Sequence, residues 1–154
     1  SLKMLIKHFS IRFEFIGNIK GVNFINDSKA TNIDAMLKAI KAANEIKKTK
    51  DIYLICGGDL KNQNIASVKL TEVQKIKNAI IFGKDKELIF KSINKFTACN
   101  LVSDLKEAVT HAFKISSAGD YIMLSPACSS LDMYKDYKER GNEFKKIVSA
   151  LADD

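Results

Sequence analysis

Short apolar runs typical of β-strands alternate with helix-like segments along this 154-residue chain, and this alternation most constrains its fold. The runs at 51–56 and 79–82 are almost continuously apolar, and glycine follows each of them. Strands that are apolar on both faces are typical of parallel sheets covered by helices on both sides. The alternation therefore predicts an α/β fold, a three-layer, Rossmann-like and mostly parallel sheet with helices on both faces.

Individual elements follow from hydrophobic periodicity and turn residues. Ser103 or Asp104 is expected to cap a helix, with Glu107 at the capping-box offset from Asp104, and Ser129 with Ser130 to open a short one. In parallel sheets ligands gather beyond the carboxyl ends of the strands, so the loops after the strands should carry the chemistry. We expect strands at 12–16, 22–26, 51–56, 79–82, 97–102 and 121–124, helices at 32–48, 67–77, 85–94, 104–116 and 141–151, and functional loops at 26–32, 57–64, 83–85 and 125–137.

The run NDSKATN at 26–32 lies where a strand passes into a helix. A helix N-terminus offers unpaired N–H groups and a positive dipole end, which suit a bound anion. Lys29 adds a point charge, Ser28 and Thr31 add hydroxyls, and the carboxylate of Asp27 must meet a cation, either Lys29 or a metal. Taken singly, any of these residues could be explained as a helix cap. The unbroken polar run favours a binding site instead.

The second polar run, GGDLK at 57–61, follows a buried strand. Paired glycines allow a sharp turn or a close approach to a ligand, and Lys61 would project from the carboxyl edge of the sheet, where it could bind a carboxylate or phosphate. A plain turn with a solvated lysine explains the spacing equally well. Neither GxxxxGK[ST] nor GxGxxG occurs in the chain, so the phosphate-binding and dinucleotide-binding fingerprints are missing.

The third run, LSPACSSLD at 124–132, contains the only proline of the chain. Cys128 could be a nucleophile, but His8 lies near the terminus and His111 lies inside an expected helix, so a base to activate it is lacking. A small buried cysteine is the better interpretation. Histidine and cysteine show no metal-ligand spacing, so we expect no metal ligands here.

The net charge of +7 raises the possibility of nucleic-acid binding, but the lysines are scattered and aromatic residues do not interleave with them. A lysine-rich solvated surface explains the charge better. Apolar runs stay well short of the ~20 residues that a membrane span needs. Three widely separated cysteines indicate reduced thiols, so we expect a cytoplasmic protein with no nucleic-acid and no membrane partner.

Together with RGNEF at 140–144, the three runs resemble the C-terminal domain of the Mur ligases, and among them the ligases that add D-glutamate. The resemblance covers 11–154, and 1–10 would be a linker or the tail of the preceding central domain. It implies that the N-terminal and central ATP-binding domains lie outside this chain, and that the isolated domain is inactive. Ile11 stands where the family usually has histidine.

The resemblance implies an ATP-dependent ligase of peptidoglycan precursor synthesis. Such an enzyme joins D-glutamate to UDP-N-acetylmuramoyl-L-alanine through an acyl phosphate, and its central domain binds most of the ATP and Mg²⁺. No residue of this domain is assigned a catalytic role with certainty, and none is expected to bind metal. By resemblance, the residues that bind D-glutamate would be Thr31, Lys61, Ser130, Leu131 and Tyr137, and those that face the nucleotide or its phosphates would be Arg12, Asp27, Ser28, Lys29 and Asn32.

Two alternatives stay open from the sequence. One is a Mur-type ligase for another amino acid, and the other is a non-enzymatic α/β module that binds nucleotides or nucleic acid. The ligase interpretation depends on a spatial expectation, which is that Thr31, Lys61 and Ser130 meet in a single pocket although they follow different strands.

Overall fold

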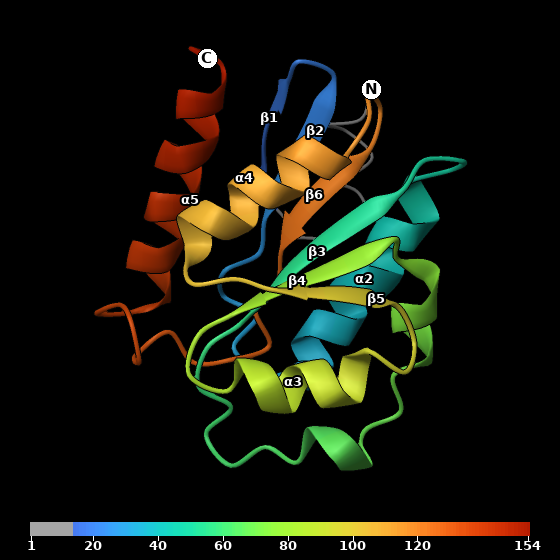
Figure 1. Ribbon diagram of the computed structural model, residues 1–154, viewed down its shortest axis with the longest axis vertical. Coiled ribbons are helices and arrows are strands. Elements are labelled where there is room, and N and C mark those ends of the chain that lie inside the picture. The colour runs from blue at the N-terminus through green and yellow to red at the C-terminus, as the bar shows by residue number, and fades with distance from the viewer. Residues whose placement is uncertain (1–13) are drawn as a thin grey trace.

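The computed structural model describes residues 14–154 (Figure 1). A six-stranded sheet forms its centre, and helices cover both faces. The strands are β1 (Glu14–Ile19), β2 (Val22–Asn26), β3 (Ile52–Gly57), β4 (Asn78–Phe82), β5 (Ala98–Leu101) and β6 (Tyr121–Leu124); the helices are α2 (Ile33–Ile46), α3 (Lys86–Ile93), α4 (Leu105–Ile115) and α5 (Tyr137–Leu151), with 3₁₀ turns η1 (Ile65–Ser67) and η2 (Thr71–Lys75).

The strand order is β1-β2-β6-β3-β4-β5, and only the hairpin pair β1 and β2 is antiparallel among these neighbours. The expected three-layer, mostly parallel α/β fold is therefore confirmed. Because β2, β6, β3 and β4 run in the same direction, their carboxyl ends meet at one edge of the sheet, as do the loops that follow them.

The sheet separates two apolar cores. In β3, Leu54 and Cys56 face the core under α2 and α3, while Tyr53 and Ile55 face the core under α4 and α5. Successive side chains of a strand point to opposite faces, so a strand buried on both sides must be apolar throughout. This explains the unbroken apolar run that made β3 recognisable in the sequence.

Two of the helices expected from the sequence do not form in the structure. The segment 67–77 forms only η1 and η2, because its buried residues Leu70, Val73 and Ile76 recur every three positions, which is the repeat of a 3₁₀ turn. Ser129 and Ser130 open no helix either. The carbonyl of Ser130 accepts the N–H groups of Met133 and Tyr134, which closes a single turn.

The bounds of α5 and β1 also differ from those expected from the sequence. α5 begins at Tyr137 rather than at Gly141, and Asp136 caps it by accepting the N–H of Glu139 at 2.8 Å. Gly141 lies inside the helix at a point where the packing leaves little room for a side chain. A Cβ there would lie 3.1 Å from Asn26 Nδ2. The strand expected to end at 16 continues to Ile19 as β1, with a bulge between Phe15 and Gly17.

The helix starts at Asn32 and Asp104 agree with the sequence, since both side chains accept a capping N–H. The strand expected at 12–16 begins outside the described residues. Among the helices of residues 14–154, none combines the length and apolar character that a membrane crossing requires.

Candidate functional site

The loop after β6 lies at the centre of the carboxyl edge and is hydrogen-bonded to its neighbours on both sides. Ala127 donates its N–H to the carbonyl of Ala30 at 2.9 Å. On the other side, Asp59 and Ser129 exchange two backbone hydrogen bonds of 3.2 and 2.8 Å. These bonds fix the relative positions of three of the predicted functional loops, which we call the β2 loop (27–32), the β3 loop (58–64) and the β6 loop (125–136).

The glycine pair at the end of β3 allows neighbouring segments to approach closely. Gly57 and Gly58 have φ values of +126° and +130°, in a region that other residues rarely adopt. A Cβ on Gly57 would lie 1.9 Å from the carbonyl oxygen of Phe82, and one on Gly58 would lie 2.6 Å from that of Ser129. The close approach allowed by the glycines is therefore to neighbouring backbone.

Left-handed backbone recurs at non-glycine residues of these loops. Lys61, Asn62 and Ala127 have φ values of 50°, 67° and 64°. The N–H of Lys61 donates to Asp59 Oδ1 at 2.9 Å, which helps to hold this conformation. Residues kept in sparsely populated conformations cluster at functional sites, and one of these three, Lys61, lines a hollow at this edge of the sheet.

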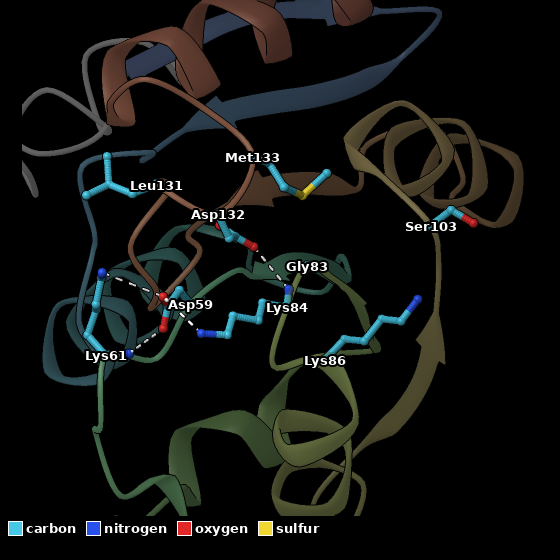
Figure 2. A pocket seen from close by; sticks show the side chains of 9 residues that line it. All are labelled: Asp59, Lys61, Gly83, Lys84, Lys86, Ser103, Leu131, Asp132 and Met133. Carbon is cyan, nitrogen blue, oxygen red and sulfur yellow. Dashed lines mark hydrogen bonds and ion pairs between the residues drawn. The ribbon is translucent and has the colours of Figure 1, made fainter.

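That hollow, which we call the lysine hollow, has a volume of about 470 Å³ and opens between the β3 loop, the turn after β4 and the β6 loop (Figure 2). Its lining residues are Asp59, Lys61, Gly83, Lys84, Lys86, Ser103, Leu131, Asp132 and Met133.

Asp59 lies between two ammonium groups in the lysine hollow (Figure 2). Its Oδ2 is 3.7 Å from Lys61 Nζ and 3.6 Å from Lys84 Nζ. The hydrogen bond from the N–H of Lys61 lowers the pKa of Asp59, and the two ammonium groups lower it further against the opposing effect of burial. Asp59 is therefore a carboxylate at neutral pH.

A second hollow of about 380 Å³, the α5 hollow, lies between the end of β2, the β2 loop and the start of α5. Lys145 and Glu14 form an ion pair of 2.8 Å at its rim. Ammonium and amide groups make this hollow rich in hydrogen-bond donors. Its lining residues are Glu14, Asn26, Asp27, Ser28, Lys29, Tyr137, Lys138, Gly141, Asn142 and Lys145.

Arg140 of α5 is fully buried behind these loops, and the sequence analysis gave it no role. Its Nη1 donates to the carbonyl of Cys128 at 3.1 Å, and its other donors bond Ser28. Burial lowers the pKa of Arg140 to about 10, so it remains a cation at neutral pH. The buried cation thus ties the β2 loop and the β6 loop to α5.

The residues expected to bind D-glutamate are divided between the two hollows. Lys61 and Leu131 line the lysine hollow, whereas Tyr137 lines the α5 hollow. Thr31 is exposed and Ser130 is buried, and neither of these two hollows includes them. The structure therefore does not line either hollow with Thr31, Lys61 and Ser130 together, and their binding roles stay predictions.

Three residues expected to face the nucleotide line the α5 hollow together: Asp27, Ser28 and Lys29. Asp27 is buried, and its Oδ2 accepts the hydroxyl of Ser125 at 2.9 Å. The hydroxyl of Ser28 donates to the carbonyl of Tyr137 at 2.7 Å. Arg12 lies outside the described residues.

Asn32, which was also expected to face the nucleotide, has a structural contact, and Cys128 is packed in the core. The side chain of Asn32 accepts the N–H of Ala35 at 2.8 Å, so its oxygen caps α2. Cys128 is buried, and burial raises its pKa to about 12. Its thiol is therefore neutral at physiological pH, as expected for a packed cysteine rather than a nucleophile.

Comparison with known sequences identifies one family model and a set of relatives. A family model described as "Mur ligase, glutamate ligase domain" matches residues 11–128. The UDP-N-acetylmuramoylalanine–D-glutamate ligase of Alkaliphilus metalliredigens is 42% identical over 142 residues, which cover 91% of this chain and 30% of that protein. The ligase of the same name from Bdellovibrio bacteriovorus is 39% identical and is covered to 29% of its length. The chain thus spans less than a third of these curated relatives.

Solved structures show the same fold at low sequence identity. A murein peptide ligase from Psychrobacter arcticus aligns with 93% of this chain at a TM-score of 0.66 and 12% identity, over 30% of its own length. A UDP-N-acetylmuramoyl-L-alanyl-D-glutamate–2,6-diaminopimelate ligase aligns with 94% of this chain and 31% of its own, at a TM-score of 0.59 and 15% identity.

Proposed function

Because this chain belongs to the Mur ligase family, as a glutamate ligase domain, we propose that it presents D-glutamate within an ATP-dependent ligase that extends UDP-N-acetylmuramoyl-L-alanine. The observation that carries this proposal is the 42% identity to a D-glutamate ligase over 91% of the chain. The domain comprises 11–154, and N-terminal and central domains account for the remaining length of such relatives.

In the proposed reaction, ATP supplies the phosphoryl group that activates the alanyl carboxylate. The amine of D-glutamate attacks the resulting acyl phosphate, and phosphate leaves as the amide bond forms. This domain contributes orientation, because holding an amine beside its target converts an encounter between molecules into a step within one complex. Its residues would hold the carboxylates of D-glutamate and leave the amine accessible.

The lysine hollow is the site that we assign to D-glutamate. Lys61 reaches into it from the β3 loop, and its side chain is 58% exposed, so a carboxylate can approach its ammonium group. Charge-assisted hydrogen bonds between lysine and carboxylate are stronger than neutral ones. Leu131 also lines this hollow, and we propose that Thr31, Ser130 and Tyr137 complete the site when the domains close around the substrates.

The α5 hollow is the side that we assign to ATP. Lys29, Lys138 and Lys145 line it with the amides of Asn26 and Asn142, and these donors fit a phosphate-bearing nucleotide. Within residues 14–154, no group of three His, Cys, Asp or Glu side chains could hold a metal ion. We therefore assign the Mg²⁺ ligands to the central domain and derive no step through Mg²⁺ here.

We also propose that the enzyme acts in the cytoplasm. Cys56, Cys99 and Cys128 are free thiols, as is usual in reducing compartments. The proposed partners are ATP, D-glutamate and UDP-N-acetylmuramoyl-L-alanine, with neither nucleic acid nor membrane.

A substrate panel tests the proposal against its alternatives. In the ligase that carries this domain, phosphate release from ATP in the presence of UDP-N-acetylmuramoyl-L-alanine should depend on D-glutamate. L-Glutamate, L-lysine and diaminopimelate should support only background release. Preference for one of these would identify a ligase for another amino acid, and salt-sensitive RNA or DNA binding without phosphate release would support a nucleic-acid-binding module.

A further inference from the structure

The turn after β4 was expected to carry chemistry, yet the sequence assigned none of its residues a role. Asp85 of this turn donates its N–H to the carbonyl of Gly58 at 3.0 Å and accepts the N–H of Leu60 at 2.7 Å. Lys84 donates its own N–H to Asp132 Oδ2 at 3.0 Å. The backbone of Lys84 is therefore fixed against the β3 loop and the β6 loop.

The side chain of Lys84 points to the same carboxylate as that of Lys61 (Figure 2). Both ammonium nitrogens are within ion-pair distance of Asp59 Oδ2, at 3.6 and 3.7 Å, so they lie no further apart than the sum of these two distances. The side chain of Asp59 is only 15% exposed, whereas that of Lys84 is 63% exposed. The ammonium group of Lys84 is thus held in place and accessible from the hollow.

Charge balance in the lysine hollow leaves a surplus that suits an anion. Three lysines, Lys61, Lys84 and Lys86, line it with only two carboxylates, Asp59 and Asp132. A single lysine could offset only one carboxylate of a dicarboxylic amino acid, and Asp59 would repel the other at short range. Lys86 is not placed to offset it, because its Nζ donates to the carbonyl of Val102 at 3.2 Å.

We infer that Lys84 is a second substrate-binding lysine, which receives one carboxylate of the amino acid while Lys61 receives the other. This inference rests on the proposed function. Asp59 holds one ammonium group on either side of its carboxylate before the substrate binds, which lowers the entropic cost of ordering two long side chains. The site thereby selects an amino acid with two carboxylates.

Steady-state kinetics of the full-length ligase with Lys84→Met test the inference. Hydrogen bonds to charged groups contribute enough that their loss should raise the KM for D-glutamate about 10-fold or more. We expect the KM for ATP to stay within about 2-fold, since Lys84 does not line the α5 hollow. Lys84→Arg, which keeps the charge, should recover most of the lost affinity.

Lys91→Met is the matched control, because it removes an exposed ammonium group from the neighbouring helix α3, and Lys91 lines neither hollow. Its KM for D-glutamate should not change. If Lys84→Met leaves this KM unchanged while Lys61→Ala raises it, the inference is overturned and the proposed function stands. An equal rise in both KM values for Lys84→Met also overturns it. A ligase that does not use D-glutamate would overturn the proposed function itself.

Discussion

Arg140 contacts Ser28 through two hydrogen bonds, from Nε to the Ser28 hydroxyl at 2.9 Å and from Nη2 to the Ser28 carbonyl at 2.6 Å. The two residues are 112 positions apart, and both are buried. Through this contact the first turn of α5 is fixed to the β2 loop, and so the α5 hollow is shaped by a cation that lines neither hollow.

Replacing Arg140 with methionine should destabilise the domain by about 3 kcal/mol. The change keeps much of the apolar stem but leaves the oxygens of Ser28 and Cys128 buried without their donor, and each such loss costs roughly 1–3 kcal/mol. Urea unfolding of the 154-residue chain measures the difference. Lys138→Met, an exposed position on the same helix, should change stability little. A loss below about 1 kcal/mol for Arg140→Met would contradict this account.

Substituting Gly58 with alanine should destabilise the chain more than the same change at Gly17. Both residues have positive φ, at +130° and +153°, but a Cβ on Gly58 would lie 2.6 Å from the Ser129 carbonyl, whereas a Cβ on Gly17 would meet no atom within 4 Å. The difference between the two variants therefore isolates the close approach of the β3 and β6 loops. We expect it to exceed about 2 kcal/mol in urea unfolding, and equal losses would show that this approach is unimportant.

The buried thiols predict a fall in stability between pH 9 and pH 10. Burial raises the pKa of Cys128 from 9.0 to about 12 and that of Cys56 well above 9.0, so both stay protonated in the folded chain. Unfolded thiols lose their protons over this range, and a state that binds fewer protons is favoured as pH rises. Each thiol should therefore reduce the free energy of unfolding by about 1 kcal/mol. Cys128→Ala should show a smaller fall, and an unchanged pH dependence would contradict the assignment.

Activity should survive the loss of the Cys128 thiol. Because this group is buried and neutral, Cys128→Ala in the full-length ligase should retain most of kcat, with at most a modest loss of stability. The measurement is phosphate release at saturating substrates, with the melting temperature recorded for the same sample. A folded variant without activity would restore the nucleophile hypothesis.

The sequence predicted the fold well because its signals are local. The two-sided apolar run of β3, the cap at Asn32 and the cap at Asp104 each depend on residues close together in the chain. The start of α5 was placed four residues late, because Gly141 was taken as a helix boundary although it is required for close packing. The four loops that were expected to be functional do lie at one edge, as the parallel sheet requires.

The site was only partly predictable, because its decisive contacts join distant residues. Nothing near Arg140 in the sequence shows that it bonds Ser28, and nothing near Lys84 shows that it shares Asp59 with Lys61. Tyr137 was grouped with Lys61 but lines the other hollow. The sequence shows only that Arg140 precedes Gly141, and the burial that makes this arginine a constraint on the loops is visible only in the structure.

The most direct test of the central claim is the dependence of ligase activity on D-glutamate after Lys61→Ala. In the full-length enzyme, this change should raise the KM for D-glutamate by about 10- to 100-fold, because it removes a charge-assisted bond to the substrate, while the KM for ATP stays within about 2-fold.

Lys48→Ala is a matched control, since Lys48 is also an exposed lysine with left-handed backbone, at φ 55°, but follows α2 away from the carboxyl edge. It should leave both KM values unchanged. An unaltered KM for D-glutamate in Lys61→Ala would contradict the claim that this domain presents the amino acid.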